Sequence, residues 1–255
     1  MIQLSVNVNK IATLRNSRGG DQPSVLQAVE VCLQAGAPGI TVHPRADERH
    51  IRLTDVTAVA EMLQARRAAG MQSAELNIEG DPRPDLMDLV AAIRPDQCTL
   101  VPVMPGEITS QAGWPVSEPS QALRQAVARL RGAGVRVSLF VEPEPAAVRW
   151  AANLGADRVE LYTEPFARAF AAGVPAGQAI FARYVESATL AHALGLAVNA
   201  GHDLDLDNLR LFRTLPHLAE VSIGHALIAQ ALWVGLGRAV RDYLAVLGDP
   251  GDRVS

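Results

Sequence analysis

The sequence alternates short runs of β-favouring residues with longer stretches of helical apolar spacing along its whole length. This alternation is typical of βα units built around a parallel sheet. We count eight such units. The expected strands, all rich in Val, Ile and Leu, cover Ile2 to Asn9, Gly39 to His43, Ser73 to Ile78, Gln97 to Pro102, Val135 to Val141, Arg158 to Tyr162, Leu196 to Ala200 and Glu220 to Ile223.

Helices are expected in the intervening stretches, at Pro23 to Gln34, Leu53 to Ala69, Ser117 to Arg131, Pro145 to Asn153 and Ala226 to Leu247. The segment from Thr163 to Leu194 is long for one crossover, and Gly173-Val-Pro175 should divide it into two helices. Eight units in 255 residues match a (β/α)₈ TIM barrel with short extra helices. A doubly wound open sheet is the main alternative, but it usually has fewer strands and a glycine-rich fingerprint after the first strand, which this chain lacks.

No linker or low-complexity tract divides the chain, so we expect one domain over residues 1–255, with a frayed tail at 248–255. Twenty-seven acidic and twenty-three basic residues give a formal charge of −4, which leaves no basic surplus for nucleic acid or an anionic membrane surface. We see neither a signal sequence nor an apolar run long enough to span a bilayer. We therefore expect a cytoplasmic protein without nucleic-acid or membrane partners.

Four of the six histidines fall at or just beyond the end of a predicted strand: His43, His50, His202 and His225. In a barrel of this kind the chemistry takes place at the carboxyl ends of the strands. Any one of these histidines could be a structural residue bonded to a carbonyl. However, they follow strands two, seven and eight, which lie close together in a closed barrel, so their convergence favours a functional site.

Two segments suggest that this site binds phosphate. The run from His43 to Arg52 holds three arginines and two histidines, and guanidinium groups match phosphate geometry. A solvated charged loop is the alternative for that run. The eighth strand leads through Gly224 and His225 directly into a helix, whose first amides would be free to hold a second phosphate.

Lys10 is the only lysine among the twenty-three basic residues, and it lies at the end of the first strand. In a chain where arginine fills every other basic position, this suggests a role that guanidinium cannot take. The ammonium could act as a compact charge on a phosphate or carbonyl, or as a Schiff-base nucleophile. The sequence leaves both roles open, as well as chance retention.

Glu75 lies among small and apolar residues in the third strand. A carboxylate that points into a barrel must be paired or have a raised pKa, and a raised pKa suits a general base. Strand alternation could instead point Glu75 outward, and the sequence does not settle its direction. After the fourth strand, residues 103–119 are rich in glycine and proline without apolar periodicity, as lid loops often are.

Four separate motifs stand out, from Asn7 to Arg18, Gly39 to His50, Val198 to His202 and Ile223 to His225. They resemble those of the pyridoxine 5′-phosphate synthase family, which belongs to the deoxyxylulose-dependent route to vitamin B6, and the resemblance covers nearly the whole chain. It implies a (β/α)₈ barrel that assembles as a homo-octamer. It also implies condensation of 1-deoxy-D-xylulose 5-phosphate with 3-amino-2-oxopropyl phosphate to pyridoxine 5′-phosphate, phosphate and water, without a metal or organic cofactor.

The resemblance also implies roles for single residues. Positions matching His43 and Glu75 serve as proton acceptors in the family, and the position matching His202 as proton donor. Contacts to the amino-ketone phosphate or the product match Asn7, Gly224 and His225. Contacts to the deoxyxylulose phosphate match Arg18, Arg45, His50 and Thr109.

This chain departs from the family pattern at three places. Asn9 and Lys10 replace an Asp-His pair, and we interpret both as retained substrate contacts in which Lys10 supplies the positive charge. Asp203 replaces a glycine and could raise the pKa of His202 or disfavour a nearby phosphate. Tyr162 replaces a histidine.

Two alternative functions remain open at this point. One is a Schiff-base sugar-phosphate aldolase that uses Lys10. The other is a phosphate-ester-binding barrel that has lost turnover, as the changes at Asn9, Lys10 and Asp203 could suggest. Retention of His43, Glu75 and His202 argues against the second.

Overall fold

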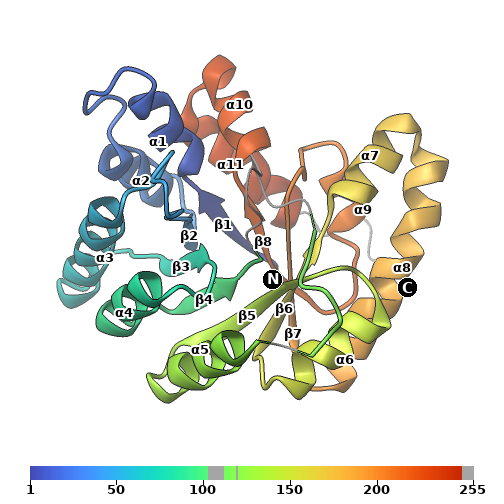
Figure 1. Ribbon diagram of the computed structural model, residues 1–255. Helices are drawn as coiled ribbons and strands as arrows, with labels where there is room; N and C mark the ends of the chain where they lie inside the picture. Colours follow the sequence, from blue (N-terminus) through green and yellow to red (C-terminus); the bar gives the residue numbers. More distant parts are fainter. Residues whose placement is uncertain (103–111, 119, 249–255) are drawn as a thin grey trace.

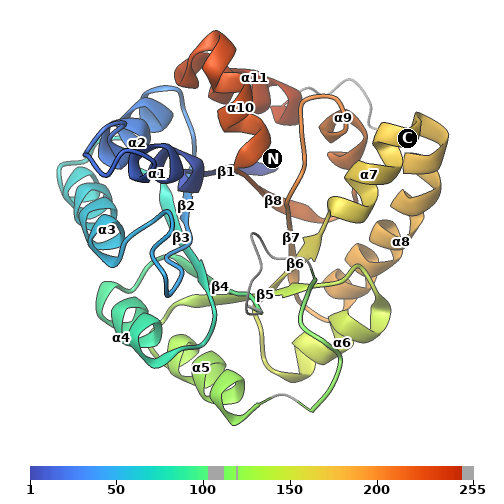
Figure 2. The same ribbon diagram turned by 45° about the horizontal axis from the view of Figure 1, so that its top comes forward.

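The computed structural model describes residues 1–102, 112–118 and 120–248. Eight parallel strands pair in chain order, and the eighth pairs with the first to close a barrel (Figures 1 and 2). The strands are β1 Gln3–Asn7, β2 Gly39–Val42, β3 Glu75–Gly80, β4 Gln97–Leu100, β5 Arg136–Val141, β6 Arg158–Tyr162, β7 Ala197–Gly201 and β8 Leu218–Ile223. The predicted (β/α)₈ barrel is confirmed.

Helices surround the barrel, as Figure 2 shows. They are α1 Asn9–Asn16, α2 Val25–Gln34, α3 Leu53–Ala68, α4 Pro84–Ile93, α5 Gln121–Gly132, α6 Pro145–Asn153, α7 Glu164–Ala172, α8 Val174–Ala193, α9 Leu209–Phe212, α10 His225–Val234 and α11 Leu236–Gly248. The predicted division between α7 and α8 occurs at Gly173. The single helix predicted from Ala226 to Leu247 is instead two, because Gly235 takes a φ of +84° and ends α10.

The apolar core lies between the strands and the helices, where the apolar faces of the helices pack on the outside of the barrel. The inside of the barrel is polar. Ser5 and Thr41 share a hydrogen bond of 2.6 Å, and Thr99 donates to Asn77 at 3.1 Å. Among the described residues, no helix has both the length and the apolar character needed to cross a membrane.

Two strand ends differ from the sequence prediction in ways that affect the site. The first strand was predicted to run to Asn9, but it ends at Asn7, whose side-chain Oδ1 accepts the backbone N–H of Asn9 at 3.0 Å as α1 begins. The third strand starts two residues later than predicted and runs to Gly80. Its carboxyl end therefore carries Glu79.

Candidate active site

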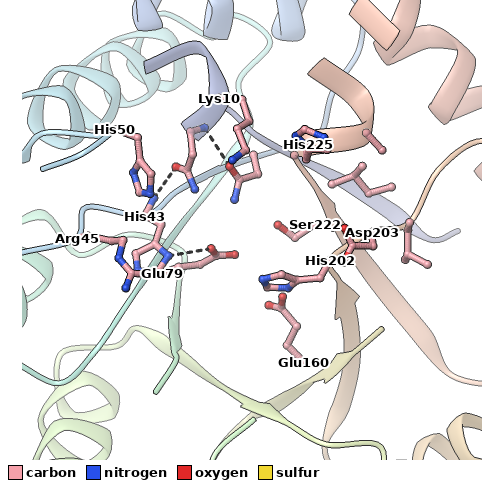
Figure 3. Close-up of a pocket in the computed structure, with 16 residues that line it drawn as sticks. Lys10, His43, Arg45, His50, Glu79, Glu160, His202, Asp203, Ser222 and His225 are labelled. Atoms are coloured by element: carbon pink, nitrogen blue, oxygen red, sulfur yellow. Dashed lines mark hydrogen bonds and ion pairs between the residues drawn. The ribbon is translucent and has the colours of Figure 1, made fainter. Parts of the chain in front are cut away.

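A cavity of about 270 Å³ opens at the carboxyl ends of the strands, which we call the mouth of the barrel. Its lining comes from six strands or the segments that follow them. Figure 3 shows how the labelled side chains lie around it. The lining residues are Asn7, Asn9, Lys10, His43, Arg45, His50, Glu79, Glu160, His202, Asp203, Leu204, Ser222, Ile223, Gly224, His225 and Ala226. The structure therefore brings together most of the residues that the sequence predicted for the site.

Three predicted residues are not in this lining. Arg18 is exposed on the segment after α1. Thr109 lies outside the described residues, as does most of the predicted lid loop. Glu75 is the third, and its placement requires a correction.

Glu75 is the first residue of β3, at the opposite end of the strand from the mouth. Its carboxylate forms an ion pair with Arg136, the first residue of β5. The resemblance gave Glu75 the role of a proton acceptor, and the sequence left the direction of its side chain open. The structure places this carboxylate at the end of β3 away from the cavity, so the expectation for Glu75 is corrected. Glu79 lies four residues further on, on the same side of the strand because side chains alternate with a period of two, and it lines the cavity.

Glu79 and His43 form a buried pair at the mouth. The Oε2 atom of Glu79 lies 3.8 Å from Nδ1 of His43, and both side chains are less than a tenth exposed. Burial raises the pKa of Glu79 to about 8, although a hydrogen bond with Ser222 opposes the change. Burial, followed by electrostatic interaction with His50 and Arg45, holds the pKa of His43 well below its usual value. The pair is therefore largely neutral at pH 7: Glu79 carries a proton that it can release near neutral pH, and His43 is an uncharged imidazole.

His43 has one nitrogen available for a substrate. Its Nε2 atom is buried and has no hydrogen-bond partner in the described part of the chain. The backbone N–H of His43 donates to Oδ1 of Asn9 at 2.9 Å, so the start of α1 fixes the end of β2. This contact gives Asn9 a structural role beside its predicted role in substrate binding.

A second carboxyl–imidazole set lies across the cavity, formed by Glu160 of β6 and His202, which follows β7 (Figure 3). Burial, followed by electrostatic interaction with Glu79 and Glu220, raises the pKa of Glu160 well above its usual range. Burial lowers the pKa of His202, while the neighbouring Asp203 acts to raise it, in the sense predicted from the sequence. Gly201 is required here, because a Cβ would lie 2.7 Å from Oε1 of Glu160.

His50 is a neutral hydrogen-bond donor rather than a cation. Its Nδ1 accepts the backbone N–H of Ile51 at 2.9 Å, which leaves the proton on Nε2. Burial, followed by the charges of Arg45 and Lys10, lowers the pKa of His50 to about 4. Its carbonyl is held by Arg15 at 3.2 Å and by Asn16 at 2.8 Å, both from α1.

Fixed positive charge comes from Lys10 and Arg45, which lie in the same lining. Arg45 is only 5% exposed, so its charge acts in a poorly solvated environment. On the β8 side, Gly224, His225 and Ala226 place the first turn of α10 at the cavity. Free amides at a helix start favour an anion.

Glu79, Glu160 and Ser222 were missed by the sequence analysis. The sequence analysis ended the third strand at Ile78 and so left out Glu79. Asp81 and Pro82, the residues that interrupt the strand pattern, come only after Glu79. Glu160 was inside a correctly predicted strand, where a carboxylate between Val159 and Leu161 was itself a signal. Ser222 is a small polar residue near a strand end and carries little signal.

A closed parallel barrel that gathers buried acids and imidazoles at its mouth, beside two cationic side chains and a helix start, has the arrangement of a (β/α)₈-barrel enzyme. The family model described as "Pyridoxal phosphate biosynthesis protein PdxJ" matches residues 4–249. The chain belongs to this family.

Curated relatives agree with that assignment over nearly their whole length. A pyridoxine 5′-phosphate synthase from Leptospira biflexa is 53% identical over 253 residues, covering 97% of each chain. Another of that name, from Bacteroides thetaiotaomicron, is 48% identical over 244 residues and covers 95% of this chain and 98% of its own. Among solved structures, tryptophan synthase from M. tuberculosis has a TM-score of 0.63 at 12% identity, over 96% of this chain and 93% of that one. At that identity the likeness concerns the fold alone.

Proposed function

We propose that this protein condenses 1-deoxy-D-xylulose 5-phosphate with 3-amino-2-oxopropyl phosphate to form pyridoxine 5′-phosphate, phosphate and water. The observation that carries the proposal is the pairing of Glu79 with His43 across the cavity from Glu160 and His202. The reaction forms an imine, closes a ring and expels water and phosphate. Each of these steps moves protons, so the chemistry needs several groups that exchange protons near neutral pH.

In this proposal Glu79 takes the role of proton acceptor that the resemblance had given to Glu75. With a pKa of about 8, Glu79 is mostly protonated at pH 7, and the ionised form that accepts the proton is on the order of a tenth of the molecules. His43 is the second acceptor, since it is neutral and its Nε2 is free of protein partners within the described ranges. His202 is the donor, with Glu160 beside it.

The two phosphate groups are bound on different sides of the cavity. Arg45, Lys10 and the Nε2–H of His50 form one cluster of donors, which suits the phosphate of the deoxyxylulose substrate. The start of α10 at Gly224 and His225, with Asn7 packed beside Gly224, suits the amino-ketone phosphate. Arg18 and Thr109 remain proposed contacts.

Incubation of the purified protein with both substrates tests the proposal. The formation of pyridoxine 5′-phosphate, followed by absorbance and identified by mass spectrometry, together with stoichiometric release of phosphate, is the expected result. Failure to form the product from active, freshly prepared substrates would overturn it, and binding without turnover would favour the phosphate-binding barrel instead.

The Schiff-base alternative is tested separately with borohydride. In the proposed reaction the amine belongs to the substrate, so Lys10 forms no covalent bond and reduction leaves the protein mass unchanged. A reduced adduct on Lys10 after incubation with deoxyxylulose phosphate alone would instead support an aldolase-type enzyme.

The proposed assembly is a homo-octamer, as the resemblance implies. An exposed apolar cluster at the end of α10 supports an assembly of copies: Leu232, Trp233 and Val234 are 68%, 84% and 41% exposed. Light scattering of the protein and of Trp233→Glu tests this, with octamers expected for the first and smaller species for the second.

A further inference from the structure

Thr163 is fully buried between the end of β6 and the start of α7. Its hydroxyl lies within hydrogen-bonding distance of two backbone carbonyls, those of Gly201 and His202. Both carbonyls belong to the segment where β7 ends and the chain turns at the mouth. Thr163 therefore links the end of β6 to the backbone that carries the His202 imidazole.

The hydroxyl of Thr163 does not make the helix-capping hydrogen bond that its position predicts, within the described residues. Thr163 is the N-cap residue of α7, where a threonine side chain usually accepts an amide of the first helical turn. Within the described ranges, Thr163 makes no such capping bond. Its side chain is directed to the neighbouring strand instead, which points to a function at His202 rather than in the helix.

The backbone at His202 needs such support. His202 and Asp203 have φ angles of +78° and +54°, in the left-handed region that residues other than glycine rarely adopt. Asn208 holds the far side of the turn, because its Nδ2 donates to the carbonyl of Asp203 at 3.0 Å. Thr163 holds the part of the turn that follows β7 directly, through the carbonyls of Gly201 and His202.

The ring of His202 also packs against two aromatic rings that contact each other. Its centroid lies 5.0 Å from that of Phe140 and 5.7 Å from that of Tyr162, and the latter two rings are 5.4 Å apart. The carbonyl of Tyr162 accepts the hydroxyl of Tyr184 at 2.7 Å, which ties this segment to α8. The dipeptide Tyr162-Thr163 thus contacts His202 through a ring and through a hydroxyl.

We infer that Thr163 is a positioning residue for proton transfer by His202, and that Tyr162 assists it by confining the imidazole ring. The inference rests on the proposed role of His202 as proton donor. A proton donor acts only when it lies within a hydrogen bond of the atom that it protonates, and a misplacement of about 1 Å can lower the rate by about 10²-fold. Thr163 fixes the carbonyl of His202, from which the direction of the side chain follows.

Two substitutions at Thr163 test the effect of the hydroxyl separately from the effect of the side chain's volume. Thr163→Val has nearly the same shape without the hydroxyl, while Thr163→Ser keeps the hydroxyl. We expect Thr163→Val to lower kcat by on the order of 10²-fold with KM for both phosphate esters within about threefold, and Thr163→Ser to stay near wild type. Thr189→Val is the matched control, because its hydroxyl also donates to a backbone carbonyl, that of Val185, on α8 away from the mouth.

A double-mutant cycle with His202→Gln distinguishes positioning from general destabilisation. If Thr163 acts through His202, Thr163→Val lowers kcat in the wild-type background and has little further effect when His202 is already replaced. A wild-type kcat in Thr163→Val would overturn the inference. So would an equal loss of kcat with and without His202.

A second variant serves if Thr163→Val does not fold, as judged by circular dichroism and gel filtration. Tyr162→Leu removes the ring beside His202 and leaves the Thr163 hydroxyl in place. The same cycle with His202→Gln then decides: loss of kcat only while His202 is present supports the inference, and any other pattern contradicts it. Because product formation by the wild-type enzyme is measured first, failure of the proposed function is distinguished from failure of this inference.

Discussion

The Nδ1 atom of His43 lies 3.8 Å from Oε2 of Glu79, and both side chains are buried at the mouth of the barrel. Burial acts on the two groups in opposite directions, because it lowers the pKa of His43 and raises that of Glu79. Both changes favour the uncharged form. A neutral pair of this kind offers one proton that can be released near neutral pH, on Glu79, and one uncharged imidazole with a free Nε2 atom among the described residues.

The first prediction concerns stability and pH. Glu79 has a pKa of about 8 in the folded protein against about 4.5 ordinarily, so the folded state holds a proton that the unfolded state releases between these values. Its contribution to stability is complete below pH 4.5 and is lost as the pH rises through 8, at up to about 1.4 kcal/mol per pH unit. Urea unfolding across this range should show a smaller decline for Glu79→Gln than for wild type. If the free energy of unfolding declined equally with pH in the two proteins, the raised pKa of Glu79 would be contradicted.

The second prediction concerns His50 as a neutral donor. Because its pKa is about 4, His50 gains no charge between pH 7.5 and 5.5. The ratio of deoxyxylulose phosphate affinities between wild type and His50→Gln, measured by calorimetry, should therefore be constant over this range. His50→Leu lacks any donor and should bind about tenfold more weakly. A ratio that grows as the pH falls would show that a histidinium binds the phosphate.

The third prediction concerns the charge of Lys10. Lys10→Gln should weaken phosphate-ester binding by about 10-fold or more, since it removes one fixed cation from the cavity. Lys10→Arg keeps the charge and should retain measurable turnover, because no covalent bond to the amine is required. Steady-state kinetics on both variants provides the check. Complete inactivity of Lys10→Arg with intact substrate binding would favour a nucleophilic lysine.

The fourth prediction concerns Asn9, whose Oδ1 accepts the backbone N–H of His43. Asn9→Ala leaves that part-buried N–H without its partner, and we expect kcat to fall by about tenfold as His43 moves. Asn9→Asp keeps the acceptor oxygen and should lose less. Comparison of kcat for the two variants, together with their melting temperatures, tests whether the contact positions His43; similar kcat values would argue that it does not.

The barrel could be predicted from the sequence because each βα unit repeats the same pattern of apolar residues. Most of the site followed from that prediction, since the carboxyl ends of parallel strands meet at one mouth. The ends of the strands were predicted less accurately. The third strand was predicted to end two residues too early, so the carboxylate assigned to the site was Glu75, at the opposite end of the barrel, and not Glu79.

Other features of the site depend on contacts that no local pattern reveals. The Nδ1 of His50 accepts the backbone N–H of Ile51, so this histidine, which lies in a segment predicted to bind phosphate, is a neutral donor. The hydroxyl of Thr163 reaches the carbonyls of Gly201 and His202, nearly forty residues away in sequence. Such contacts between distant segments are set by the closed barrel.

The most direct test of this account compares turnover by Glu79→Gln and Glu75→Gln. The two substitutions make the same chemical change on the same strand, one at the mouth and one at the opposite end. Pyridoxine 5′-phosphate formation from the two phosphate esters should fall by at least about 10²-fold in Glu79→Gln and stay within about threefold of wild type in Glu75→Gln. Loss of turnover in Glu75→Gln with wild-type turnover in Glu79→Gln would contradict the account.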